Sequence, residues 1–206
     1  MFRMIAITAA LIFSILLCVN YADAGEVIDQ LSVSIDKVID ILKNKELKKS
    51  ENTAKRRSML RKTISESFAF DEMAKRSLAT HWRSRTETEK REFVLLFTDL
   101  LERSYVNKIE SYSDEKIIYL NENIEGEYAV VKTKMLTTKN VEIPVDYKLF
   151  KSGSKWHVYD VVIEGVGLVN NYRTQFNKII RTSSYQDLVK RLQSKQDEIM
   201  YDEKSK

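Results

Sequence analysis

The chain has 206 residues and a formal net charge of +4, from 34 lysines and arginines against 30 aspartates and glutamates. So small an excess, without a motif that interleaves basic and aromatic residues, excludes the usual classes of nucleic-acid-binding protein. Two histidines and one cysteine, Cys18, are too few for a metal cluster or a disulfide framework. We therefore expect no cofactor and a fold that is stabilised by its apolar core.

The first 24 residues have the parts of a secretory signal peptide. Arg3 is basic, residues 4–19 are apolar or small, and residues 22–24 (Ala-Asp-Ala) fit a small-x-small cleavage site. The alternative is a retained membrane anchor, but the apolar run is short for a span of about 20 residues. Leu17 precedes Cys18 where a lipoprotein signal needs a small residue. We predict cleavage after Ala24 and a periplasmic protein.

Residues 25–206 are expected to form one domain, whose first part, residues 25–112, is helical. Apolar side chains recur there at three- and four-residue spacing, which is typical of amphipathic helices. Thr86 and Glu89 match a capping box at the start of the longest helix. The basic run that starts at Lys43 is interpreted as a solvated helix face, with weak attraction to an anionic membrane as the alternative. The predicted helices cover residues 27–42, 52–66, 71–81 and 86–109.

Between residues 116 and 164 the apolar period changes from helical spacing to alternation. Short polar turns separate the alternating segments, so neighbouring strands should be antiparallel. One face of the sheet is apolar and the other polar. Pro144 lies within a segment and indicates an edge strand or a bulge there. The predicted strands cover residues 116–121, 127–138, 141–150 and 155–164.

Two C-terminal helices are predicted within residues 168–200. Asn170 or Asn171 is expected to cap the first, and the second should cover about residues 185–200. The predicted fold is therefore α+β: a four-stranded antiparallel sheet with one apolar face covered by N-terminal and C-terminal helices.

The strand-to-helix connection around Gly165 and Gly167 lies where many α/β enzymes have a phosphate-binding loop. It lacks the third glycine and the lysine of a phosphate loop, so we interpret both glycines as structural. They either form a hinge or satisfy a local backbone requirement. Asp160, with Glu164 at same-face spacing, is interpreted as a solvated or ion-paired surface charge. The alternative is a small cone-shaped α+β enzyme, such as an isomerase or dehydratase acting on an apolar substrate, in which Asp160 or His157 points into the pocket.

Three segments together resemble the MlaC family, the periplasmic phospholipid-binding component of a lipid ABC transport system. The similarity covers about residues 26–195. Ala69 and Gly167 depart from it, since an acidic residue and a serine are expected there. The segments read FAFDEMAKRSLATHWR at 68–83, IPVDYKL at 143–149 and WHVYDVVIEGVGLVNNYRTQF at 156–176.

The resemblance implies a soluble shuttle that makes and breaks no bond. Its expected partners are phospholipid, an MlaA-type outer-membrane lipoprotein complex and an MlaD-type inner-membrane complex, but no nucleic acid. The carrier is expected to be a monomer that maintains outer-membrane lipid asymmetry. A scaffold protein with a solid core is a further alternative, because a sequence does not distinguish a filled core from a cavity.

A lipid pocket is expected where apolar faces of the sheet and helices meet. We place Arg173 nearest the lipid head group, because it is a cation in the first turn of its helix. The predicted lining residues are Phe97, Leu101, Tyr105, Val131, Met135, Ile143, Val145, Tyr147, Tyr159, Val161, Ile163, Tyr172 and Phe176.

Overall fold

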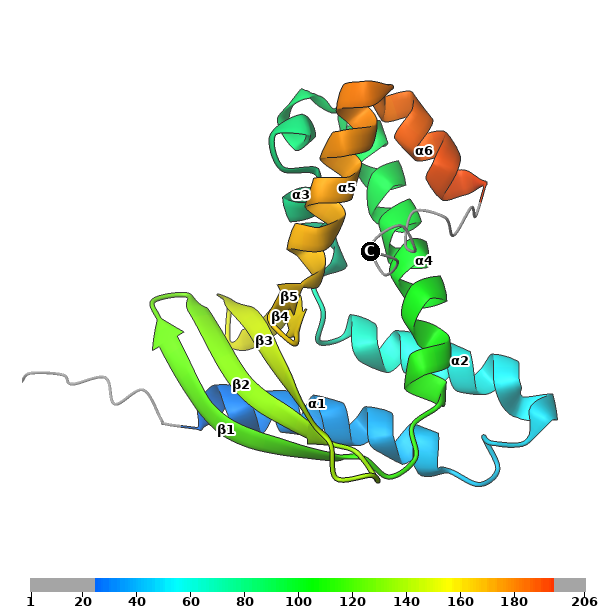
Figure 1. Ribbon diagram of the computed structural model, residues 1–206, viewed down its shortest axis with the longest axis vertical. Helices are drawn as coiled ribbons and strands as arrows, with labels where there is room; N and C mark the ends of the chain where they lie inside the picture. The colour runs from blue at the N-terminus through cyan, green and yellow to red at the C-terminus, as the bar shows by residue number, and fades with distance from the viewer. Residues whose placement is uncertain (1–24, 195–206) are drawn as a thin grey trace, which may run out of the picture.

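The fold is α+β, as the sequence predicts (Figure 1). The structure, a computed structural model, describes residues 25–194. The predicted signal peptide and the end of the predicted last helix lie outside these residues. Within them, no helix is long and apolar enough to cross a membrane.

The helices follow the predicted segments closely. The predicted capping box is confirmed: the Glu89 amide donates to Thr86 Oγ1 (3.2 Å) and the Thr86 amide donates to Glu89 Oε2 (2.8 Å). The predicted helix 71–81 ends early and continues as a 3-10 helix. The elements are α1 (Glu26–Lys43), η1 (Ser50–Asn52), α2 (Thr53–Ser65), α3 (Phe70–Leu78), η2 (Ala79–Ser84), α4 (Glu87–Glu110), α5 (Leu168–Thr182) and α6 (Tyr185–Gln193).

The sheet is antiparallel with the order β1-β2-β3-β4-β5, so it has five strands rather than the predicted four. The extra strand arises because Glu164 (φ 50°) and Gly165 (φ 82°) form a two-residue hairpin turn. The strands are β1 (Lys116–Glu125), β2 (Tyr128–Leu136), β3 (Glu142–Ser152), β4 (Lys155–Ile163) and β5 (Val166–Gly167).

Pro144 lies in β3, which is a central strand and has no bulge at this position. The prediction of an edge strand is therefore wrong for β3 as a whole. Pairing between β3 and β4, however, ends at Val145 and Ile163. Pro144 lies just beyond that end, where its missing N–H leaves no gap in the ladder.

Two bulges each aim a carboxylate at the start of a helix. Leu120 is the extra residue of β1, and the next inward side chain, Glu122, accepts hydrogen bonds from the Gly25 and Ile28 amides (2.9 and 2.7 Å). Tyr159 is the extra residue of β4, followed by Asp160. Both carboxylates satisfy amides that a helix N-terminus leaves free.

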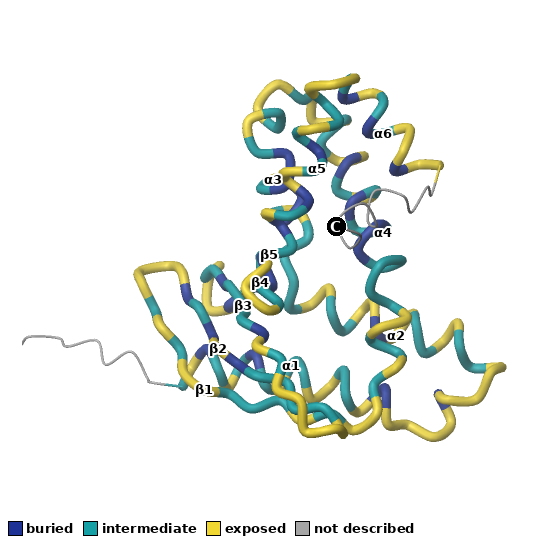
Figure 2. Tube along the Cα trace, viewed as in Figure 1, coloured by how far each residue is buried: buried dark blue, intermediate teal, exposed yellow. Residues whose placement is uncertain are grey.

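Apolar side chains form two main cores, visible as dark blue segments in Figure 2. The helical core joins α3, α4, α5 and α6, and several of its rings meet edge to face, as Phe93 and Phe176 do at 5.7 Å. The sheet core lies between α1 and the face of the sheet that carries Val131 and Leu149, called the inner face below. A small third cluster joins α1 to α2 through Leu42 and Leu60.

Candidate functional site

The inner face consists of four rows of side chains that cross the strands. Antiparallel register places these residues directly opposite one another. From one end of the sheet to the other, the rows are Ile124–Ala129–Leu149–Val158, Glu122–Val131–Tyr147–Val161, Tyr119–Thr133–Val145–Ile163, and Ile117–Met135–Ile143.

The first row lies in a closely packed environment, called the packed end. Ala129, Leu149 and Val158 are each at most 2% exposed. Val27 and Leu31, from the first half of α1, are equally buried in the same cluster. This end of the sheet is ordinary protein interior.

The last two rows are covered less completely and are called the open end. Four of their residues, Tyr119, Met135, Ile143 and Ile163, contact the sheet core but are only half-buried, whereas Thr133 and Val145 in the same rows are buried. Leu168, the first residue of α5, is half-buried beside the same core. Large apolar side chains therefore remain partly uncovered on one continuous part of the inner face, which is the arrangement that an apolar ligand needs.

The structure divides the predicted lining residues between the two cores. The sheet core holds Val131, Met135, Ile143, Val145, Tyr147, Val161 and Ile163. The helical core holds Phe97, Leu101, Tyr172 and Phe176, with Tyr105 at its margin. The spacing of these residues in the sequence predicts that their side chains face inward. It does not predict whether a given side chain packs in the sheet core or in the helical core.

Tyr159 lies on the opposite face from Val161 and Ile163, so its predicted orientation is wrong. The bulge at Tyr159 shifts the alternation of β4 by one residue. Its ring packs against Phe150 and Tyr128 (centroids 6.3 and 6.0 Å apart), and the Arg76 guanidinium lies 4.1 Å from its centroid. Tyr159 therefore forms a cation–π contact with α3, away from the sheet core.

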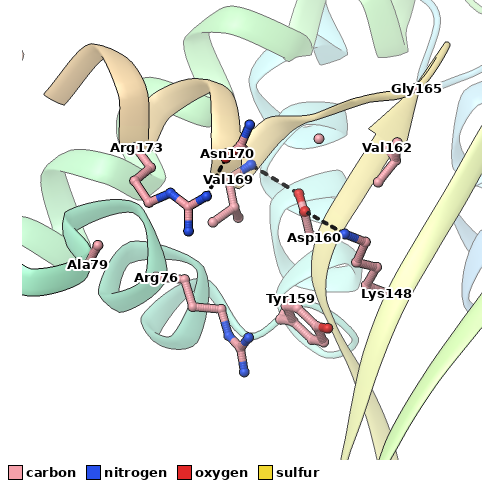
Figure 3. A pocket seen from close by; sticks show the side chains of 11 residues that line it. Arg76, Ala79, Lys148, Tyr159, Asp160, Val162, Gly165, Val169, Asn170 and Arg173 are labelled. Atoms are coloured by element: carbon pink, nitrogen blue, oxygen red, sulfur yellow. Dashed lines mark hydrogen bonds and ion pairs between the residues drawn. The ribbon is translucent and has the colours of Figure 1, made fainter. Parts of the chain in front are cut away.

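A polar cleft of about 550 Å³ lies on this outer side of β4 (Figure 3). Three cations reach it from three elements: Arg76 from α3, Lys148 from β3 and Arg173 from α5. Arg173 was predicted to lie near a lipid head group. Its side chain donates a hydrogen bond to Asn170 and lies across β4 from the open end.

Asp160 also lines the cleft, but it is 5% exposed and not the surface charge that we expected. Its Oδ1 accepts a hydrogen bond from the Val169 amide (3.0 Å), and its Oδ2 lies 3.8 Å from Lys148 Nζ. Asp160 thus caps α5, and the predicted caps Asn170 and Asn171 lie inside the helix. Because Asp160 lies nine residues before Val169, the sequence contains no local capping motif that would indicate this hydrogen bond.

The two glycines before α5 have local roles. Gly165 has φ 82°, which glycine adopts without strain. A Cβ at Gly167 would lie 3.0 Å from Asp160 Oδ2, so a larger residue would push on the cap. These observations favour the backbone interpretation, and the hinge stays a prediction.

The residues proposed for catalysis do not form an acid–base pair in the cleft. Glu164 is exposed in the β4–β5 turn, and His157 stacks near Phe150 (6.0 Å) on the outer face. Asp160 is already engaged by Val169 and Lys148. Across residues 25–194, no group of three or more metal-ligating side chains occurs.

Comparisons with known proteins agree with these features. The MlaC protein family matches residues 33–194. A Haemophilus influenzae protein, the intermembrane phospholipid transport system binding protein MlaC, is 22% identical over 121 residues, or 56% of each chain. The match thus spans about half the length of that relative.

A phospholipid-binding protein from Ralstonia solanacearum, solved in complex with a phospholipid, has a similar structure. The TM-score is 0.74 at 20% sequence identity, over 83% of this chain and 97% of that chain. At this identity the likeness establishes a shared fold.

Proposed function

The chain belongs to the MlaC family, and we propose that it is a phospholipid-binding transport protein of the periplasm. The observation that carries the proposal is the open end, where Tyr119, Met135, Ile143 and Ile163 are half-buried, whereas Ala129, Leu149 and Val158 at the other end of the same sheet are buried. The phospholipid-binding names of the two similar proteins support it. We propose that the acyl chains lie against this surface.

The physical need for such a surface follows from the cost of moving lipid through water. A diacyl lipid has about thirty methylenes, and exposing them costs on the order of 25 kcal/mol at about 0.8 kcal/mol each. A carrier must therefore offer apolar side chains in place of neighbouring lipids. We propose that this chain does so while moving between an MlaA-type outer-membrane complex and an MlaD-type inner-membrane complex.

The head group is proposed to remain in water beside the open end. Arg173 is separated from that surface by β4, so a lipid lying on the inner face does not reach it directly. The polar cleft is accordingly not part of the proposed acyl site.

Native mass spectrometry of the purified protein, before and after incubation with phospholipid vesicles, tests the proposal. We expect protein that carries diacyl phospholipid. Apo protein under both conditions would contradict the carrier function. An extract without lipid, together with turnover of an apolar substrate, would instead support the enzyme alternative; neither lipid nor turnover would support the scaffold.

A pair of matched variants locates the site. Ile143→Arg places a charge on the open end and should abolish lipid retention, because a buried unpaired charge is costly. Val141→Arg makes the same change two residues earlier, at a side chain that is 54% exposed, and should retain lipid. Circular dichroism verifies that both variants are folded. Equal retention by the two would place the lipid elsewhere.

A further inference from the structure

A tyrosine hydroxyl lies among the side chains of the open end. The hydroxyl oxygen of Tyr119 is buried and has no hydrogen-bond partner among residues 25–194. Its row on the inner face continues through Thr133, Val145 and Ile163. Burying a hydroxyl without a partner is unfavourable, and such groups are few in folded proteins.

Three other buried or half-buried hydroxyls among the described residues have partners within the chain. Thr133, in the same row, donates to the Val145 carbonyl oxygen (2.5 Å). Tyr112 donates to the Glu115 carbonyl (3.0 Å), and Tyr185 donates to the Glu89 carbonyl (3.3 Å). Four other buried polar atoms of residues 25–194 also lack a partner, among them Trp156 Nε1 in the sheet core, but Tyr119 supplies the hydroxyl in this set and belongs to the open end.

The surroundings of Tyr119 favour a neutral acceptor. Burial, followed by the nearby Tyr147 and Asp36, raises the pKa of the Tyr119 hydroxyl, so it remains a proton donor at physiological pH. An anionic ligand group would also be repelled by Asp36, the acidic residue that acts on this hydroxyl. A water molecule would need two or more polar partners. The Thr133 hydroxyl of the same row already donates its proton to the Val145 carbonyl oxygen, so it has only acceptor capacity left.

We infer that Tyr119 donates a hydrogen bond to an ester carbonyl oxygen of the bound lipid. This inference rests on the proposed lipid-binding function. It assigns a chemical preference within that function: the site should distinguish ester-linked from ether-linked lipids. An ester carbonyl is neutral, accepts hydrogen bonds and is attached directly to an acyl chain, so it can accompany that chain into an apolar environment.

A competition experiment tests the assignment. Vesicles would contain equal amounts of a diester phospholipid and its diether analogue, which has the same head group and chain length but no carbonyl. Native mass spectrometry would report the ratio bound to the protein. We expect the wild type to prefer the diester by roughly fivefold, the effect of one hydrogen bond. Tyr119→Phe should bind the two lipids equally.

Tyr112→Phe is the matched control, because it removes a phenol hydroxyl that has a partner within the chain and lies in the small α1–α2 cluster. It should keep the wild-type preference. Tyr119→Phe should melt at the same temperature as the wild type or higher, since it removes a buried unpaired hydroxyl.

The unfavourable outcomes are distinguishable. Equal binding of both lipids by the wild type, or an ester preference that survives Tyr119→Phe, would overturn the role of Tyr119 and leave the lipid-binding function intact. Wild-type protein that retains neither lipid would overturn the proposed function, and the inference with it.

Discussion

The two ends of the inner face are built from the same strands by the same alternation, yet one is packed and the other is open. At the packed end, α1 is fixed to the sheet by polar as well as apolar contacts. Gln30 exchanges hydrogen bonds with the Trp156 backbone (2.6 and 3.0 Å), and Glu122 holds the first amides of α1.

Farther along α1 the contacts change. Ile41 and Leu42 are buried against Leu47 and Leu60, outside the sheet core. The helix is therefore attached to the sheet at one end and to α2 at the other. This comparison teaches that an open apolar surface does not require unusual strand residues. It arises where the covering helix is held by another partner.

The largest expected effect is at the packed end. Leu149→Ala should lower the free energy of unfolding by about 3 kcal/mol, because it leaves a cavity between Ala129 and Val158, which are themselves buried. Urea denaturation of lipid-free protein measures the loss. A change below about 1 kcal/mol would show that this end is not tightly packed.

A second test concerns the attachment of α2 to the C-terminal end of α4; α2 follows α1 and turns back alongside it (Figure 1). Arg56 and Arg57 of α2 both bind Glu110 of α4 at 2.8 Å. Glu110→Gln should lower the free energy of unfolding by about 2 kcal/mol at neutral pH, since hydrogen bonds between charged groups are lost. Chemical denaturation at pH 7 measures this change.

The ion pairs of Glu110 with Arg56 and Arg57 also predict that the free energy of unfolding depends on pH. Hydrogen bonds from Arg57, together with Arg56, lower the pKa of Glu110 in the folded protein. The stabilisation is therefore present above the usual glutamate pKa of about 4.3 and is lost as the pH falls through the lower folded value. Glu110→Gln should lose less stability over that range than the wild type. The hydrogen bond from Lys90 also lowers the pKa of Glu87, but this carboxylate is exposed and screened by solvent, so Glu87→Gln should change the pH dependence much less than Glu110→Gln does.

A third, smaller effect concerns the connection between the sheet and α5. Gly165→Ala should lower the free energy of unfolding by about 1.5 kcal/mol, because φ is 82° at this position. Gly165→Asn should recover part of the loss, since asparagine tolerates positive φ better. Lipid exchange with vesicles should be unchanged. Slower exchange with unchanged stability would support the hinge instead.

The smallest change in stability is expected at the open end. Ile143→Ala should cost at most about 1 kcal/mol, because the side chain is only half-buried in the lipid-free protein. Its main effect should be a loss of lipid retention, measured by native mass spectrometry. Leu149→Ala should reduce lipid retention less than Ile143→Ala does, provided that the protein remains folded. A stability loss equal to that of Leu149→Ala would remove the distinction between the two ends.

Much of this fold could be predicted because its signals are local. The capping box at Thr86 and Glu89 depends on residues three positions apart, and the helical and strand periods depend on spacing within one element. The fifth strand was missed because two residues are too few to show a period. The orientation of Tyr159 was missed because a bulge inserts a residue that only the pairing with β3 reveals.

The sequence by itself determined the α+β class, the antiparallel pairing and the inward faces apart from that of Tyr159, because each follows from short-range periodicity and turn length. Only the tertiary structure decided which inward faces meet. It assigned Phe97 and Tyr172 to a closed helical core and Ile143 to the open end of the sheet. It also converted Asp160 from an apparent surface charge into the cap of α5. The physical reason is that burial depends on what covers a residue, and the covering element is distant in the chain.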